Sequence, residues 1–133
     1  MTSTLFLIIV IISILILVHE WGHFYSARML GVKVEEFGFG FPPILFSKIK
    51  NGVRYSFNVF PFGGFVKIYG EQGEGEGDKT SFAGRPAWQR FIILAAGVGM
   101  NMVLAWIFFT AGAVAGIPST SEGNAEDTPV SVI

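Results

Sequence analysis

Cysteine is absent from the 133 residues, which excludes disulfides and thiolate ligands, so any zinc site must use His, Asp or Glu. Charged residues make up only 14% of the chain, against 51% apolar residues. This apolar share exceeds that of an ordinary soluble domain and favours a membrane protein. The formal net charge of −1 is accompanied by no single-signed basic face, so nucleic acid is not an expected partner.

The first long apolar run covers residues 5–18, with Ser13 as its one interruption. At 1.5 Å per residue it reaches roughly 21 Å, short of the roughly 30 Å hydrocarbon layer. We therefore expect residues 1–30 to form one transmembrane helix, with Gly31 as its C-cap. A cleavable signal peptide is the alternative, but the start MTST has no positive charge and LVHEWGH offers no small-x-small cleavage site.

The second apolar run covers residues 91–117 and contains no ionisable side chain. Its length and composition predict a second transmembrane helix, within a segment that we assign to residues 85–118. Arg85 and Arg90 mark its start, and Pro118 marks its end because a helix does not extend past proline.

All nine lysines and arginines lie between positions 28 and 90. The positive-inside rule then predicts a multi-pass protein of the cell inner membrane, with the loop 31–90 in the cytoplasm and both termini outside. The tail 119–133 has three acidic residues and no basic one, as expected of an extracytoplasmic segment.

Residues 31–69 are predicted to form a small β region. VRYSFNVF alternates apolar and polar residues with the period of a strand, and Asn51-Gly52 before it is a strong hairpin turn. LFSKIK, VKVEEFGFGF and GGFVKIYG are also strand-like, joined by turn residues in PPIL and PFGG. The many phenylalanines exceed what a small sheet can bury, so we expect the sheet to dip into or lie against the membrane; a soluble β-core is the alternative.

The fold class expected is therefore a membrane α-helical protein: two transmembrane helices with an intervening membrane-associated β-hairpin or small sheet. Between the sheet and the second helix lie residues 70–84, of which 70–78 alternate glycine mainly with acids. This composition predicts a flexible linker that returns the chain to the membrane.

The motif HEWGH comprises His19, Glu20 and His23 at the end of the first helix. Residues i and i+4 lie on one helix face, so the two imidazoles can bind one metal ion. Glu20 projects about 100° from His19, near enough to act as a general base without being a ligand. Ionisable groups within a membrane helix cost at least a few kcal/mol each, so a metal site is favoured over a helix end among the lipid headgroups.

A catalytic zinc needs a third protein ligand and an open position for water. The acidic candidates lie outside both apolar runs, and we interpret each as a solvated surface acid; they are Glu35, Glu36, Glu71, Glu74, Glu76, Asp78, Glu122, Glu126 and Asp127. The residues alone therefore supply two ligands and a base.

Three motifs in order resemble one family: HEWGH in the first membrane helix, then FPFGGFVKIYGE, then SFAGRPAWQRFIILAAGVGMNMVLA. From about residue 5 to 118 the chain resembles the amino-terminal part of the site-2 protease family of intramembrane zinc metalloproteases, in its bacterial regulator-of-sigma-E protease (RseP-like) branch. The resemblance implies a zinc endopeptidase that cuts transmembrane segments of regulatory membrane proteins such as anti-sigma factors.

By this resemblance His19 and His23 are zinc ligands and Glu20 is the catalytic base. The stretch from GFGFPPILF to PFGGFVKIYG resembles the family's re-entrant β-hairpins, where a substrate is held extended by strand addition. This comparison assigns substrate binding to the segment 63–65, namely Gly63, Gly64 and Phe65. Asn101 matches a family asparagine near the active site, with helix packing as the alternative reading.

The family's third ligand is an aspartate in a later Leu-Asp-Gly motif, which does not occur in the sequence. PDZ domains follow the family's second helix, and the tail 119–133 would be the start of that region. We therefore expect the 133 residues to be the amino-terminal portion of such an enzyme or a truncated member that lacks a complete zinc site. The alternative function is a non-catalytic membrane protein that binds a partner's membrane segment.

Overall fold

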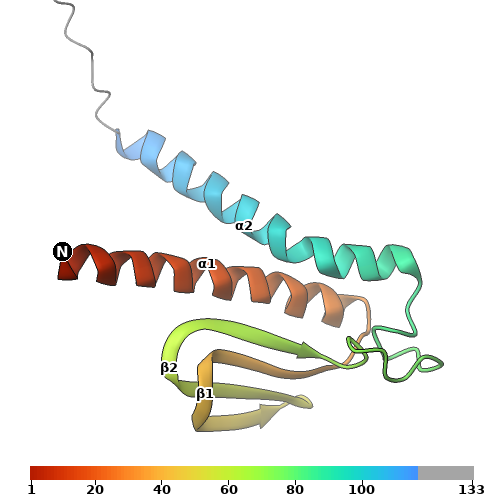
Figure 1. Cartoon of the computed structure of the whole chain (residues 1–133). Coiled ribbons are helices and arrows are strands. Elements are labelled where there is room, and N and C mark those ends of the chain that lie inside the picture. The colour runs from red at the N-terminus through yellow and green to blue at the C-terminus, as the bar shows by residue number, and fades with distance from the viewer. Residues whose placement is uncertain (117–133) are drawn as a thin grey trace, which may run out of the picture.

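A computed structural model describes residues 1–116: two long helices lie on the same side of a small sheet, and the first of them packs between the second and the sheet (Figure 1). Helix α1 covers Thr2–Met29, strands β1 and β2 cover Val34–Lys50 and Val53–Ile68, and helix α2 covers Ala87–Ala115. The fold class predicted from the sequence is confirmed. The predictions for Pro118 and for the tail 119–133 lie outside the described residues.

Both helices are long and apolar enough, by length and composition, to cross a membrane. Helix α1 ends one residue before the predicted limit, and Gly31 follows it with φ +74°, a left-handed conformation that favours glycine. The guanidinium of Arg85 donates to the Gly31 carbonyl at 2.9 Å and so ties the end of α1 to the start of α2. From there the two helices diverge toward the C-terminal end of α2 (Figure 1).

Each strand bends back on itself, so the four predicted strand segments belong to two continuous strands. Strand β1 pairs antiparallel with β2, but residues 36–39 pair a second time, in the parallel direction, with residues 54–57. Four segments thus lie side by side in the order 64–68, 34–39, 53–58 and 44–50. The segment 64–68 lies next to α1, and the segment 44–50 is the opposite edge (Figure 1).

The buried core is small and lies where the second half of α1 meets the sheet and the first turns of α2. Its members are Phe24, Ala27, Val32, Val34, Val53, Ile68 and Ile93. Large apolar side chains elsewhere on the sheet stay exposed, including Phe46 at 66% and Leu45 at 63%. Many of the sheet's aromatic residues are therefore not buried within the described residues, and their contact with lipid stays a prediction.

The segment between β2 and α2 follows a defined course of turns. Lys33 donates its backbone N–H to Thr80 and accepts from Tyr69, and Ser81 is fully buried. Thr80 donates both its backbone N–H and its hydroxyl to the Asp78 carboxylate at 2.8 Å, which lowers the pKa of Asp78. The acids and glycines of this segment gave no sign of these contacts, and its flexibility stays a prediction.

Candidate active site

Two histidines of α1 face each other in the half-buried zone between α1 and α2. The Nε2 atoms of His19 and His23 are 3.1 Å apart, and the two rings meet edge to face at 82°. This arrangement follows from the i, i+4 spacing, which sets both side chains on one helix face.

The orientation of the second imidazole is fixed by α2. The Nδ1 of His23 lies 2.8 Å from the carbonyl oxygen of Ile93. Because a carbonyl only accepts, Nδ1 carries the proton and Nε2 keeps its lone pair for a metal. Ile93 is fully buried and His23 is half-buried, so the carbonyl side of this contact is shielded from solvent.

Two glycines let α1 and α2 approach at the histidines. A side chain at Gly22 would collide with the backbone carbonyl of Ala96, and one at Gly97 would collide with the imidazoles of His19 and His23. Small residues at such crossings permit close contact between membrane helices. The histidine pair therefore lies directly against the backbone of α2.

Glu20 points to the other neighbour of α1, the sheet. Its Oε2 accepts a hydrogen bond from the backbone N–H of Val66 at 3.2 Å, and its side chain is half-buried. A hydrogen bond to a carboxylate is among the stronger ones and restricts the rotamers of a long side chain. Strand β2 thus holds this carboxylate on the side of α1 that faces the sheet.

A second contact aligns β2 with α1 two turns earlier. The N–H of Gly63 donates to the Ser13 hydroxyl at 3.3 Å, and Gly63 has φ +75°. A side chain at Gly63 would meet Ile16, and one at Gly64 would meet Leu17 and the Gly38 carbonyl. The helix and the neighbouring strand therefore occupy the space that a side chain at either glycine would need.

The two histidines fit a zinc ion. Two nitrogens bound to one tetrahedral zinc at about 2.05 Å lie about 3.3 Å apart, close to the separation found here. Among residues 1–116 no group of three His, Asp or Glu side chains converges on one point. The described part of the chain thus offers two ligands, and any third ligand comes from elsewhere.

The acidic candidates within the described residues do not approach the histidines. Glu36 accepts a hydrogen bond from the Ser56 hydroxyl at 2.7 Å, and Glu35 pairs with Lys67 at 3.4 Å. Glu35 and Glu36 are thus half-buried and paired on the sheet instead of fully solvated as predicted, and neither joins the histidines in a three-ligand group.

Comparison with known families gives a match over most of the chain. The model of "Peptidase family M50" matches residues 7–130. The chain belongs to peptidase family M50. This is the site-2 protease family whose motifs the sequence resembles, so the predicted family is confirmed.

Relatives within family M50 have names that agree with the site. A "putative zinc metalloprotease" of Clostridium perfringens is 42% identical over 121 residues, which are 91% of this chain and 34% of the relative. One of Vibrio cholerae is 33% identical over 132 residues, 93% of this chain and 28% of the relative. A "probable membrane metalloprotease" of Arabidopsis thaliana chloroplasts is 36% identical over 112 residues, 81% of this chain and 25% of the relative.

The chain spans about a third or less of the length of these M50 relatives. The family match and the two long apolar helices identify a membrane protein. The relatives' names associate the family with zinc and proteolysis.

Asn101 lies on α2 one turn beyond Gly97, so the two share a helix face. It is half-buried, and its side-chain oxygen has no hydrogen-bond partner within the described residues. Phe65 packs its ring over Gly38 of the neighbouring strand. The roles of Asn101 and Phe65 in an M50 site stay predictions.

Three contacts of this M50 site were not predicted from the sequence: the Val66 amide, the Ile93 carbonyl and the Ser13 hydroxyl. The first two are backbone groups, which no residue type reveals. Ser13 did give a signal, because it is the one polar residue in the first apolar run, and a hydroxyl there needs a partner.

Proposed function

We propose that the protein is an intramembrane zinc metalloendopeptidase of the site-2 type. His19 and His23 are its zinc ligands and Glu20 is its catalytic base. The observation that carries the proposal is the opposed pair of Nε2 atoms, 3.1 Å apart, in a helix long and apolar enough to cross a membrane. Ionisable residues at such a position are costly and point to function.

Each of the three side chains then has a distinct task. The His23 ring donates from Nδ1 to Ile93 and directs Nε2 toward the metal. Glu20, held by the Val66 amide, takes a proton from the attacking water and passes it to the leaving amine. Zinc, when bound, supplies Lewis acidity toward the water and the peptide carbonyl. The remaining ligand, an acid, is contributed from beyond residues 1–116.

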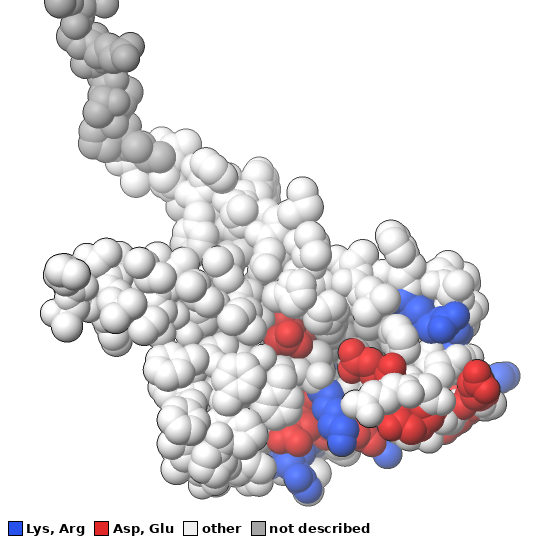
Figure 2. Space-filling model, in the orientation of Figure 1, with Lys and Arg blue, Asp and Glu red and all other residues white. Residues whose placement is uncertain are grey.

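We further propose that the site opens toward the cytoplasm. On the face shown in Figure 2 the charged side chains gather at one end of the molecule, while most of the surface of the two helices is uncharged. All the basic residues fall between positions 28 and 90. The positive-inside rule then assigns the loop 31–90 to the cytoplasmic side of the inner membrane and both termini to the other side.

The proposed substrate is a transmembrane segment of a regulatory membrane protein, such as an anti-sigma factor. A helical segment must unwind before its peptide bonds can be reached, and an added strand on an exposed sheet edge holds a peptide extended. The segment 64–68 is the sheet edge nearest α1, and because its Val66 N–H is donated to Glu20, a substrate strand added there would displace that contact. Gly63, Gly64 and Phe65 at the start of that edge are the proposed substrate-binding residues, with Asn101 near the cut bond.

The alternative function is a non-catalytic membrane protein that binds a partner's membrane segment. Its basis is that the described residues bring two potential zinc ligands together, His19 and His23, which by themselves leave half of a tetrahedral shell to water. Under this alternative the histidines bind zinc weakly or not at all, which separates it from the protease by metal analysis.

The test replaces Glu20 by Gln in the full-length gene product. Cleavage of a single-span anti-sigma-type reporter should fall by roughly 10²–10⁴-fold, because the base is lost, while bound zinc stays at one equivalent by metal analysis. Glu71→Gln, the same change at an exposed position, is the matched control and should cleave normally. Undiminished cleavage by Glu20→Gln would remove Glu20 from the mechanism, and wild-type protein without zinc or cleavage would favour the binding function.

A further inference from the structure

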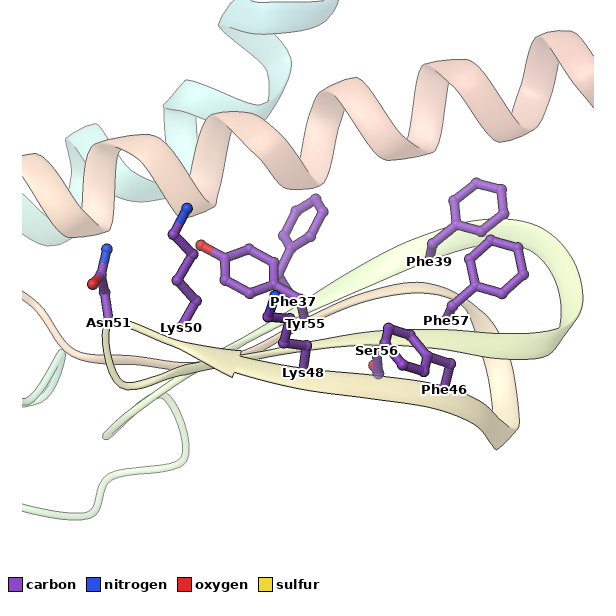
Figure 3. Close-up of a pocket in the computed structure, with 9 residues that line it drawn as sticks. All are labelled: Phe37, Phe39, Phe46, Lys48, Lys50, Asn51, Tyr55, Ser56 and Phe57. Atoms are coloured by element: carbon purple, nitrogen blue, oxygen red, sulfur yellow. The ribbon is translucent and has the colours of Figure 1, made fainter.

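A pocket of 660 Å³ lies on the sheet, and neither histidine lines it (Figure 3). Aromatic rings line one end of it, and the ammonium groups of Lys48 and Lys50 lie toward the other. Phe37, Tyr55 and Lys50 project from the sheet toward the side of α1 in this view. The pocket therefore changes from apolar to cationic along its length.

The strand register explains this gradient. Phe46 pairs with Phe57, and Phe57 pairs in turn with Phe39, so three phenylalanines form one row across the sheet. The rings of Phe39 and Phe57 stack at 5.1 Å and 17°. Two residues further along the edge strand comes Lys48, on the same side of the strand as Phe46 because side chains alternate with a period of two.

The contacts of β2 with α1 show the position along the α1 axis of the phenylalanine row and of the row that contains Lys48. The phenylalanine row ends at Phe39, which pairs with Gly64, and a side chain at Gly64 would meet Leu17. This row therefore lies at the level of Leu17, inside the predicted span.

The lysine row lies about one helical turn further toward the end of α1. Lys48 pairs with Tyr55, and the row continues through Phe37 to Val66, whose amide holds Glu20. Lys50 pairs with Val53 and lies further still along the strand. Lys48 is thus level with Glu20, and Lys50 is nearer the membrane surface.

The two lysines have no acidic partner in the part of the chain that the structure describes. The ion pair found there joins Lys67 to Glu35 at 3.4 Å. Both Lys48 and Lys50 are exposed. The pocket thus has two unpaired cations toward one end and aromatic rings at the other. Such a surface complements a ligand that has an anionic head and an apolar tail.

We propose that this pocket binds an anionic phospholipid of the cytoplasmic leaflet. The phosphate contacts Lys48 and Lys50, and one acyl chain lies across Phe46, Phe57 and Phe39. The choice of the cytoplasmic leaflet depends on the membrane orientation proposed under the protein's function. The match between the lipid and the pocket's charges and apolar side chains does not depend on it. Lysines near a membrane surface attract anionic lipids by about 1 kcal/mol each, and the phenylalanines give the tail an apolar surface that a free phosphate ion cannot use.

The experiment measures lipid binding to the full-length gene product in detergent by native mass spectrometry. Phosphatidylglycerol and phosphatidylcholine with identical chains are the probes. We expect phosphatidylglycerol to be retained preferentially, and Lys48→Ser with Lys50→Ser to lower its affinity about 30-fold. Arginine at both positions should preserve binding, which shows that a loss in the serine variant reflects charge and not misfolding.

Lys67→Ser is the matched control, because it removes one positive charge from an exposed position outside the pocket, and it should leave the affinity unchanged. Glycerol phosphate, the head without the chains, should not compete at concentrations where the lipid saturates. Equal retention of the two lipids, an equal loss in Lys67→Ser, or full competition by glycerol phosphate would each overturn the proposal. Displacement of the lipid by a substrate peptide would assign the pocket to the substrate instead. Zinc content and cleavage test the protease proposal separately.

Discussion

Helix α2 and strand β2 hold α1 from two sides, and they do so by different means. Helix α2 meets His19 and His23 through close backbone packing at Gly22 and Gly97, with one carbonyl at His23. Strand β2 meets Ser13 and Glu20 through backbone N–H groups. The proposed site is thus divided: α2 contacts the proposed metal ligands, and β2 contacts the proposed base.

The chemistry of the two side-chain types explains this division. An imidazole that binds a metal needs its other nitrogen to donate, so a helix carbonyl suits it. A carboxylate only accepts, so it needs an N–H, and the edge of a sheet has N–H groups that its own ladder does not use. Helix interiors offer none, because their amides are bonded within the helix.

The largest effect is expected on the α2 side. Gly97→Ala brings a methyl group into the two imidazoles and should displace both ligands together. Zinc binding and cleavage should fall in parallel, by about 100-fold or more, because a displacement near 1 Å has such an effect on catalysis. Metal analysis and the reporter assay on one preparation measure both.

Gly99→Ala is the control for that change, since no atom lies within 4 Å of the added methyl group. It lies on the same helix and has the same gain in helix propensity. Normal zinc binding by Gly97→Ala would show that the close packing of α2 against the two imidazoles does not determine their position.

A smaller effect is expected on the β2 side. Val66→Pro removes the N–H that Glu20 accepts, and proline is tolerated on a sheet edge where that N–H points out of the sheet. Cleavage should fall roughly tenfold, the effect of losing one hydrogen bond to a charged group, while zinc stays bound.

Val66→Ala keeps the amide and should cleave almost as well as the wild type. This pair isolates the backbone group from the side chain. A loss of zinc in Val66→Pro would show that the two sides of the site are not independent, and it would contradict the comparison.

The smallest effect is expected at Ser13, far from the reacting groups. Ser13→Ala removes the acceptor for Gly63, and hydrogen bonds of this kind within membranes are worth about 0.6 kcal/mol, so cleavage should fall about threefold or less. Thr110→Ala is the control, because its hydroxyl bonds only within its own helix, to the Trp106 carbonyl. Equal rates for the two variants would show that this contact does not align the strand.

The sequence predicted the elements well because each has a strong local signal. The two long apolar runs predict long helices, even though the first run alone is shorter than the hydrocarbon layer, and Asn51-Gly52 predicts a hairpin turn, which the structure has between β1 and β2. The i, i+4 spacing of His19 and His23 likewise predicts two facing imidazoles. These features depend on neighbours in the chain.

The features that the sequence did not predict are those that depend on distant segments. The double pairing of residues 36–39 arises because both strands bend, and nothing local specifies which segments then meet. The Val66 amide and the Ile93 carbonyl contact α1 across 46 and 70 residues of chain. Ser81 is buried by the turns around it, although its composition predicted only a linker.

The two anchors of β2 along α1 also make the helix and the strand commensurate. Ser13 and Glu20 are seven helical residues apart, about 10 Å, and their partners Gly63 and Val66 are three strand residues apart, also about 10 Å. The helical segment and the extended segment between the two contacts therefore have the same length. An inserted or deleted residue between positions 63 and 66 would make these lengths unequal. The number of residues between the two contacts therefore determines which strand amide faces Glu20.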